Sequence, residues 1–347
     1  MPENKKNNKG ILVLGIIIFL VGVSIAALAY YTFLAPSIAT KEKYFYVHSD
    51  ESYEQTLDRI QKEGIVKSFS LFKYASQFMD LKESGIKPGR YRLSNDLGNR
   101  RFIGNLRAGY QEAVAFRFQN IRLKENFAGL LGKAFEADST SFIDLLNNST
   151  IAAQYGFTKD NFFSMFIPNT YEIYWNTKPE EIIKRFASEY DKFWNDERKA
   201  KAAALNLSTQ EVSTLASIVK GEALHVNEMP KIAGLYLNRL KKGMLLQADP
   251  TVIFANNDFS IRRVLNKHLT IDNPYNTYRF KGLPPGPIMM PSIASIDAVL
   301  NYEHHNYIYM CAKDDFSGYH LFADNMADHQ LNARKFQKAL DERNIKK

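Results

Sequence analysis

A single uncharged apolar run near the N-terminus constrains this chain more than any other feature of its sequence. Residues 11–34 read ILVLGIIIFLVGVSIAALAYYTFL, 24 residues without one charged side chain. As a helix rising about 1.5 Å per residue, this run is long enough to cross the roughly 30 Å hydrocarbon core of a bilayer. Its terminal position and the lysines beside it argue against a buried helix of a globular core. We therefore expect a transmembrane helix over residues 11–34.

The charges that precede the run predict its orientation. Three lysines and a single acid lie within the first nine residues, which favours an N-terminus in the cytoplasm. A cleaved signal peptide is the alternative, because Ser37-Ile38-Ala39 offers small residues for cleavage, but the run exceeds the ~7–15 apolar residues of such signals. We expect a cytoplasmic tail over 1–10 and an uncleaved single-pass anchor in the cytoplasmic (inner) membrane, with the rest of the chain outside the cytoplasm.

Composition excludes several classes of function. Of the 347 residues, 45% are hydrophobic and 24% charged, which is ordinary for a globular protein and enough for two modest domains. The net charge of +8 is spread along the chain without a long basic run, so we expect no nucleic-acid partner. Cys311 is the one cysteine, which excludes an intrachain disulfide and a cysteine-based zinc site, and the seven histidines lack ligand spacing. We expect no metal and no cofactor.

Beyond the anchor the sequence predicts an α+β protein of two parts. After a short polar connector over 36–43, residues 44–118 alternate between strand and helix and predict a small α+β subdomain. Its expected elements are strands at 44–47, 89–93 and 113–118, and helices at 52–63, 68–79 and 102–106. Residues 119–347 predict a larger domain of mixed helices and strands, in which the charged pattern over 178–204 predicts one long helix.

A helix predicted to begin at Ser208 carries the first candidate for chemistry. Ser208 and Glu211 form a capping box, and apolar residues recur from Val212 at helical spacing. Glu222 lies at the edge of this stripe, where partial desolvation raises the pKa of a carboxyl group and suits it to hold a proton near neutral pH. On spacing alone, a glutamate at the edge of a core without a catalytic role is the more common outcome.

The sequence that follows Glu222 favours a catalytic role for this residue. A second helix is predicted over 229–242, with Gly243 at its end. Five blocks resemble, in order and spacing, the YceG-like (MltG) family of endolytic murein transglycosylases. They are LASIVKGEA at 215–223, AGLYLNRLKKGM at 233–244, LQADPTVIFA at 246–255, YNTY at 275–278 and GLPPGPI at 282–288. The resemblance covers nearly the whole chain, including the N-terminal anchor.

The resemblance implies a membrane-anchored enzyme that cuts nascent peptidoglycan strands internally. It implies a LysM-like subdomain over 44–118 and a catalytic transglycosylase domain over 119–347. The family's catalytic glutamate is the second acid of an E-x-E-[ST] motif and matches Glu222. This chain departs from the family at three places: Lys220 replaces the first acid, Ala223 replaces the hydroxyl residue, and Asn169 replaces an acid in a Phe-Pro-Asp-Thr-like turn.

Further polar and aromatic residues are candidates for binding a saccharide. Tyrosine rings pack against the apolar faces of sugars, and amide side chains suit an acetamido group. The expected substrate-binding residues are Asn238, Gln247, Asp249, Tyr275, Asn276, Thr277 and Tyr278. Asp249 precedes Pro250 and is equally well explained as a helix N-cap. For His320 the sequence favours a hydrogen-bonded histidine of the core over a site residue.

Three functions are compatible with these residues. By resemblance, a lytic transglycosylase needs one acid, because the C6 hydroxyl of the muramic residue attacks C1; Glu222 first donates and then accepts a proton, and the product ends in 1,6-anhydroMurNAc. A hydrolytic muramidase with Asp249 as its second carboxylate is one alternative. A catalytically inactive peptidoglycan-binding scaffold is the other. The expected partners are glycan strands and the cytoplasmic membrane, and the resemblance also allows peptidoglycan synthases.

Overall fold

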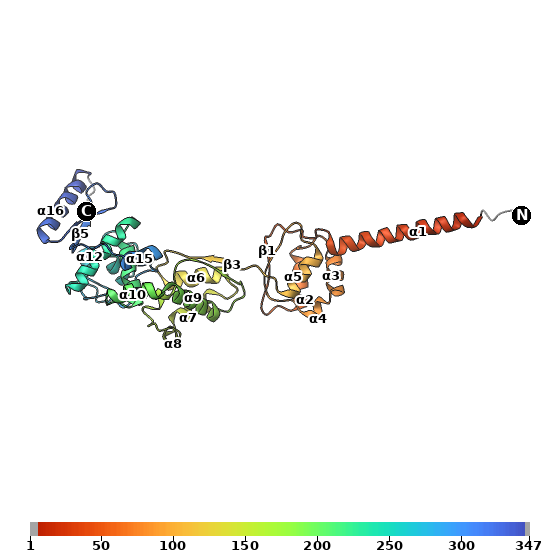
Figure 1. The fold of residues 1–347 in the computed structure, drawn as a ribbon, viewed down its shortest axis with the longest axis horizontal. Helices are drawn as coiled ribbons and strands as arrows, with labels where there is room; N and C mark the ends of the chain where they lie inside the picture. The colour runs from red at the N-terminus through yellow and green to blue at the C-terminus, as the bar shows by residue number, and fades with distance from the viewer. Residues whose placement is uncertain (1–5, 344–347) are drawn as a thin grey trace. The chain divides into compact units, whose positions relative to one another are not determined.

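The computed structural model describes residues 6–343 and divides into two compact units of mixed α and β structure. The first unit holds the chain up to residue 114 together with 172–177, and the second holds 115–171 and the chain from 178 onward. All three sheets among the described residues are two-stranded. The expectation of a mixed α+β protein is therefore confirmed (Figure 1).

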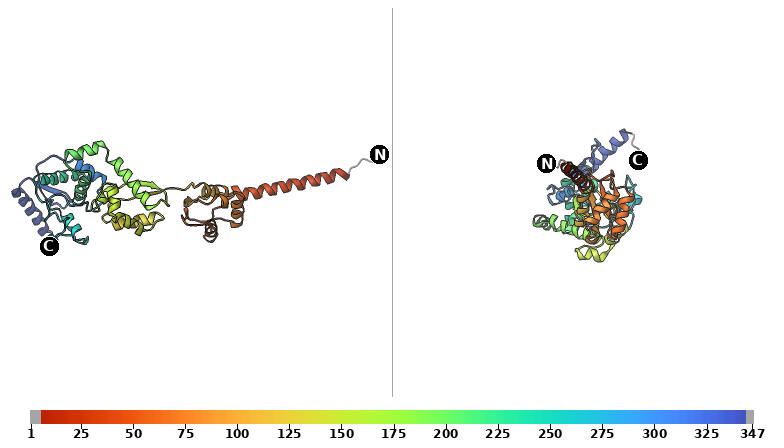
Figure 2. Two further views of the ribbon diagram at one scale, coloured as in Figure 1. Left: turned by 90° about the horizontal axis from the view of Figure 1, so that it is seen from below. Right: turned by 90° about the vertical axis from the view of Figure 1, so that its right-hand side faces the viewer.

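The apolar run forms one long helix. α1 spans Lys6–Ala29 and continues into a π-helical turn, η1, over Tyr30–Leu34. Within residues 9–34, the most apolar 18-residue stretch has a mean hydropathy of 3.1, and none of that stretch is buried against the rest of the protein. Figure 2 shows α1, in red, as a continuous helix. This helix is long and apolar enough to cross a membrane; residues 1–5 of the expected cytoplasmic tail lie outside the described residues.

The rest of the first unit wraps two strands and several helices around one core. Its elements are β1 (Tyr44–Val47), α2 (Tyr53–Lys62), α3 (Phe69–Phe78), α4 (Leu81–Ser84), β2 (Gly89–Arg92) and α5 (Asn99–Ala108). β1 and β2 pair antiparallel, with Tyr44 opposite Arg92 and Val47 opposite Gly89. α2 begins at a full capping box, because the side chains of Ser52 and Gln55 each accept from the other's backbone N–H.

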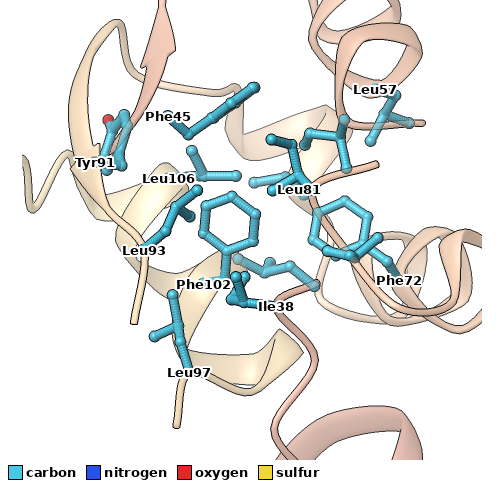
Figure 3. Packing of buried hydrophobic residues seen from close by; sticks show 14 of the residues in the cluster. Ile38, Phe45, Leu57, Phe72, Leu81, Tyr91, Leu93, Leu97, Phe102 and Leu106 are labelled. Carbon is cyan, nitrogen blue, oxygen red and sulfur yellow. The ribbon is translucent and has the colours of Figure 1, made fainter. Parts of the chain in front are cut away.

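An aromatic cluster fills the centre of this unit. The Phe102 ring lies 6.1 Å from Phe45 and 5.7 Å from Phe72, measured between ring centroids, and all three side chains are fully buried. Figure 3 shows Phe102 among leucines contributed by several elements. The core therefore joins β1, α3 and α5 directly.

The polar connector expected over 36–43 is wrong in its first half. Ser37 N–H donates to Leu97 O at 2.9 Å, and Ala39 N–H donates to Ile65 O at 2.9 Å. Ile38, between them, is buried in the core of the first unit. Backbone hydrogen bonds hold these residues in place, which a polar side-chain pattern does not reveal.

The second unit is mostly helical. β3 (Val114–Arg117) and β4 (Thr170–Ile173) pair with each other, and the division of the chain into two units falls within both strands. The antiparallel ladder between β5 (Tyr309–Ala312) and β6 (His320–Ala323) belongs wholly to the second unit. Its helices are α6 (Lys124–Ala134), α7 (Ser139–Asn147), α8 (Ser149–Gln154), η2 (Phe162–Met165), α9 (Pro179–Phe193), α10 (Asp196–Ala204), α11 (Thr209–Glu222), η3 (Val226–Glu228), α12 (Met229–Lys241), α13 (Asp249–Ala255), α14 (Asn266–Leu269), α15 (Ile293–Leu300) and α16 (Met326–Glu342).

The single helix expected over 178–204 is two helices, α9 and α10. The chain breaks at Trp194, whose side chain is fully buried, and Asn195 starts α10 by accepting a hydrogen bond from Arg198 N–H at 3.0 Å. An asparagine N-cap stabilises a new helix start, and the buried indole fixes the turn. A continuous charged pattern does not show this break.

α11 is the central helix of the second unit. Every residue from Val212 to Val219 is buried, and α12, α13 and α15 pack around it. The predicted capping box is present, since the Ser208 side chain accepts from Glu211 N–H and the Glu211 carboxylate accepts from Ser208 N–H. Because the helix is enclosed along its length, the position of its last residue, Glu222, is firmly determined.

Replacing Phe102 by Ala tests the core of the first unit. Loss of a fully buried phenylalanine should reduce the stability of this unit by about 3–5 kcal/mol, because a cavity remains where the ring packed. Hydrogen exchange of the full chain should show faster exchange in α3 and α5. Arg101→Gln, on the exposed side of the same helix, is the control; equal exchange in both variants would contradict this packing.

Candidate active site

Glu222 ends α11 with its side chain half-buried at the edge of a cavity. The Tyr236 hydroxyl, from α12, donates to Glu222 Oε1 at 2.9 Å. Tyr236 itself is 1% exposed, so this hydrogen bond is made where water has little access. The packing of α11 against α12 thus gives the carboxyl group one fixed donor.

The cavity beside Glu222 has a volume of about 240 Å³ and a mainly polar lining. Residues of α11, of α12, of the loop into α13, of the segment that holds Tyr278 and of the β5–β6 ladder enclose it. Its polar lining residues are Glu222, Tyr236, Arg239, Gln247, Asp249, Tyr278 and His320. Of the expected site residues, the structure therefore brings Glu222, Gln247, Asp249 and Tyr278 together.

The surroundings of Glu222 raise its pKa to about 7. Burial is the largest cause, because it disfavours the charged form. The hydrogen bond from Tyr236 and the charge of Arg239 lower the pKa, whereas the negative charge of Asp249 raises it. Glu222 is consequently divided between its protonated and ionised forms near neutral pH, as an acid that must donate and then accept a proton requires.

Asp249 is not a helix N-cap. α13 begins at Asp249 itself, its N-cap is Ala248, and no side chain accepts a capping hydrogen bond there. The Asp249 carboxylate instead accepts from the Tyr278 hydroxyl at 2.6 Å. The cap interpretation is therefore wrong, and a second carboxylate lines the cavity that holds Glu222.

Gly221 allows the two carboxylates to share this cavity. A Cβ atom at Gly221 would lie 2.9 Å from Pro250 Cβ, closer than real side chains approach. The absence of a side chain lets the start of α13 pack against the end of α11. Asp249 is brought toward Glu222 by this contact.

Arg239 fixes the part of the cavity wall that the loop before α13 and the start of β5 form. The sequence did not predict this residue as part of the site. Arg239 is 7% exposed, and its guanidinium group donates to Leu246 O at 2.7 Å and to Ile308 O at 2.6 Å. These bonds tie α12 to the loop before α13 and to the strand region of β5. Arg239 and Tyr236 both lie in the block AGLYLNRLKKGM, which was the available signal.

His320 has a partner, as expected, but it lines the cavity instead of the hydrophobic core. Its ring Nδ1–H donates to Glu228 Oε2 at 2.9 Å, and its backbone N–H donates to Glu228 Oε1 at 2.7 Å. The Glu228 side chain is 5% exposed, so both its oxygens are occupied by one residue in a buried setting. This pair orients the imidazole ring beside the cavity.

The other expected site residues lie behind the cavity wall. Asn238 donates to His305 O and Tyr307 O, and Asn276 donates to Leu269 O and Ile271 O. Thr277 accepts from Ala248 N–H at 3.0 Å, and Tyr275 packs on Phe254 with its ring centroid at 4.7 Å. The contacts of Tyr275, Asn276 and Thr277 support the loops that carry Asp249 and Tyr278, and those of Asn238 support the segment that leads into β5.

Comparison with known proteins places the chain in a family. The sequence profile of the YceG-like family matches residues 45–335. The chain belongs to the YceG-like family. The resemblance inferred from the five sequence blocks is thereby confirmed.

Curated relatives of this YceG-like chain share one name. A protein of Bacillus subtilis strain 168, named endolytic murein transglycosylase, is 28% identical over 317 residues, covering 86% of this chain and 85% of that protein. A protein of the same name from Streptococcus pneumoniae R6 is 25% identical over 334 residues, covering 86% of this chain but 59% of the relative. A solved structure of a putative yceG-like protein from Listeria monocytogenes has a TM-score of 0.54 at 22% identity, covers 84% of this chain and 99% of that one, and shows a shared fold.

The side chains that line the candidate site carry carboxyl, phenol, guanidinium, amide and imidazole groups. Among the described residues there is no group of three His, Cys, Asp or Glu side chains placed to share a metal ion. Ala223, which replaces the hydroxyl residue of the family motif, is buried directly after Glu222.

Glu222→Gln should change stability in a pH-dependent way. Because the folded-state pKa of about 7 exceeds the ordinary value of 4.5, the folded wild-type chain favours protonated Glu222, and stability falls as the pH rises through this interval. The neutral amide avoids that loss, which is at most about 3 kcal/mol. The difference in melting temperature, variant minus wild type, should therefore be larger at pH 8 than at pH 4. A difference in melting temperature that is the same at both pH values would show that the pKa is not raised.

Proposed function

We propose that this chain is an endolytic murein transglycosylase, a lyase that cleaves peptidoglycan strands between MurNAc and GlcNAc. The observation that carries the proposal is Glu222, a carboxyl group with a pKa of about 7 in a polar cavity. The names of the family relatives support the same activity. A single acid that is half protonated at neutral pH suits a reaction in which one group both donates and accepts a proton.

In the proposed reaction Glu222 protonates the glycosidic oxygen, and the bond between that oxygen and C1 breaks. The C6 hydroxyl of the same muramic residue attacks C1 and gives its proton to the Glu222 carboxylate, so no water is consumed and a 1,6-anhydroMurNAc end forms. Tyr236 stabilises the carboxylate after the first transfer. Gln247, Tyr278 and the ring of His320 are proposed to contact the sugar from the cavity wall. Four further residues are proposed to hold the cavity wall in place without touching the sugar: Asn238, Tyr275, Asn276 and Thr277.

A hydrolytic muramidase is the second candidate, and one observation favours it. Asp249 is not occupied by helix capping, and it lines the cavity with Glu222. A pair of carboxyl groups at one site is the usual equipment of a glycosidase. In that reaction Asp249 would act on C1 or on a water molecule while Glu222 protonates the leaving oxygen.

We further propose that the chain is a single-pass protein of the cytoplasmic membrane with its N-terminus inside. The 26-residue helix over 9–34 supports an anchor. We propose residues 44–118 as a LysM-like subdomain and 119–347 as the catalytic domain. The order β1, α2, α3, α4, β2, in which helices lie between two strands that pair antiparallel, supports the first. An anchor would hold the cavity near newly made strands, where peptidoglycan synthases act and where internal cuts would end elongation.

A digest of purified peptidoglycan tests the proposed activity. The full chain should release products ending in 1,6-anhydroMurNAc, one water lighter than muramidase products and arising from strand interiors. Glu222→Gln should lower the rate by at least about 10²-fold with the fold retained, because the amide cannot deliver a proton. Mass spectrometry of the product ends is the measurement, and Asp249→Asn is the companion variant.

Two other outcomes would decide against the lytic reaction. Reducing muramic ends that disappear in Asp249→Asn would establish the hydrolase instead. Intact strands after digestion with the wild-type chain, together with retained binding, would establish a scaffold. Wild-type turnover in Glu222→Gln would remove Glu222 from either mechanism.

Topology is tested by accessibility of introduced cysteines. In the Cys311→Ser background, a cysteine at Lys43 should react with a membrane-impermeant maleimide on intact cells, whereas one at Asn4 should not. The unmodified chain should remain in the membrane fraction at full length. A soluble product shortened near Ala39 would mean that the helix is a cleaved signal.

A further inference from the structure

A second hollow lies on the other side of the helix end that carries Glu222. It is a groove of about 520 Å³ whose wall includes Lys220 and Gly221 of α11 and the loop at 120–123. Met290 N–H donates to Ile121 O at 2.8 Å, which fixes that loop against the segment leading to α15. The groove is therefore a built part of the second unit and lies within the size range of ligand sites.

The lining of this groove is cationic. Lys220 and Arg122 supply two positive charges, and two amides, Asn120 and Asn126, stand beside them. No lining residue among those that the structure describes is Asp or Glu. Arg122 lies over the ring of Phe259 at 4.8 Å, a contact that orients its guanidinium group without neutralising it. Neither cation has a carboxylate partner within residues 9–343. Such a lining fits an anionic ligand better than a neutral sugar.

The position of the groove relative to Glu222 suggests which anion it takes. Lys220 and Glu222 are two residues apart on one helix, so their Cα atoms are roughly 5 Å apart and their side chains project to different sides. A muramic residue with its glycosidic bond at Glu222 carries a lactyl ether and a peptide on the same ring. That peptide is rich in free carboxylates and must leave the cavity on one side.

Resting on the proposed function, we infer that this groove binds the carboxylate-bearing stem peptide of the muramic residue being cut. Lys220 and Arg122 would pair with peptide carboxylates, while Asn120 and Asn126 would bond to its amide groups. Phe259 and Met289 provide an apolar floor for small side chains. The enzyme would then select strands that still carry peptides over strands from which they have been removed.

Two substrates made from one preparation test this inference. Uncross-linked glycan strands with their stem peptides are compared with the same strands after an amidase has removed the peptides. With the full chain in detergent, Arg122→Gln combined with Lys220→Gln should raise KM for peptide-bearing strands by about tenfold and leave kcat nearly unchanged. The same variant should cut the stripped strands as the wild type does.

Matched variants separate charge from structure. Arg122→Lys combined with Lys220→Arg keeps both charges and should retain most of the affinity. Lys199→Gln removes an exposed charge from α10, away from the groove, and should change neither substrate's KM. A loss that is equal on both substrates, or no loss on peptide-bearing strands, would overturn the inference.

Binding to the Glu222→Gln chain keeps this test independent of turnover. That chain should bind peptide-bearing strands about tenfold more tightly than stripped ones, and the double glutamine variant in the same background should remove the difference. If the wild type cuts neither substrate while this binding difference is present, the proposed function fails and the groove stands. If the wild type cuts both substrates and the binding difference is absent, the groove proposal fails alone.

Discussion

The hydrogen bond from Tyr236 to Glu222 is the contact on which the candidate site depends. It joins the end of α11 to the middle of α12 at 2.9 Å, between a nearly inaccessible phenol and a carboxyl group with a raised pKa. Because burial alone would hold the proton on Glu222 too firmly, the phenol donor moderates that effect and keeps the pKa near neutrality. The core that encloses α11 serves to keep this pair in place.

Close backbone packing then decides which chemistry can take place beside this pair. Gly221 lets α13 approach, so that Asp249 shares the cavity with Glu222, and Arg239 fixes the loop on the opposite wall. The result is one protonatable acid beside a second carboxylate that a tyrosine holds by a hydrogen bond. On the reverse side of the same helix end, a cationic groove offers a place for an anionic substituent. Cleavage and selection of the strand would thus depend on two faces of one helix terminus.

Local signals in the sequence predicted local structure well. The capping box predicted at Ser208 marked the start of α11, because a cap involves side chains within one turn of the chain. The same local reasoning failed for Asp249, where a tyrosine 29 residues away takes the carboxylate that a cap would have used. It also failed at Trp194, because burial of the indole in the unit's core is a tertiary effect that breaks a continuous charged pattern.

The sequence by itself determined the apolar helix, the mixed α+β class, the family and the choice of Glu222 as the candidate acid. Each of these rests on a property that neighbouring residues carry, such as hydropathy, helical spacing or an ordered set of short blocks. Only the tertiary structure decided that Tyr236, Arg239 and the Glu228–His320 pair surround that acid, and that Asn238 and Asn276 lie behind the wall. The physical reason is that a pKa and a cavity arise from burial and from contacts between distant segments, which spacing along a chain does not encode.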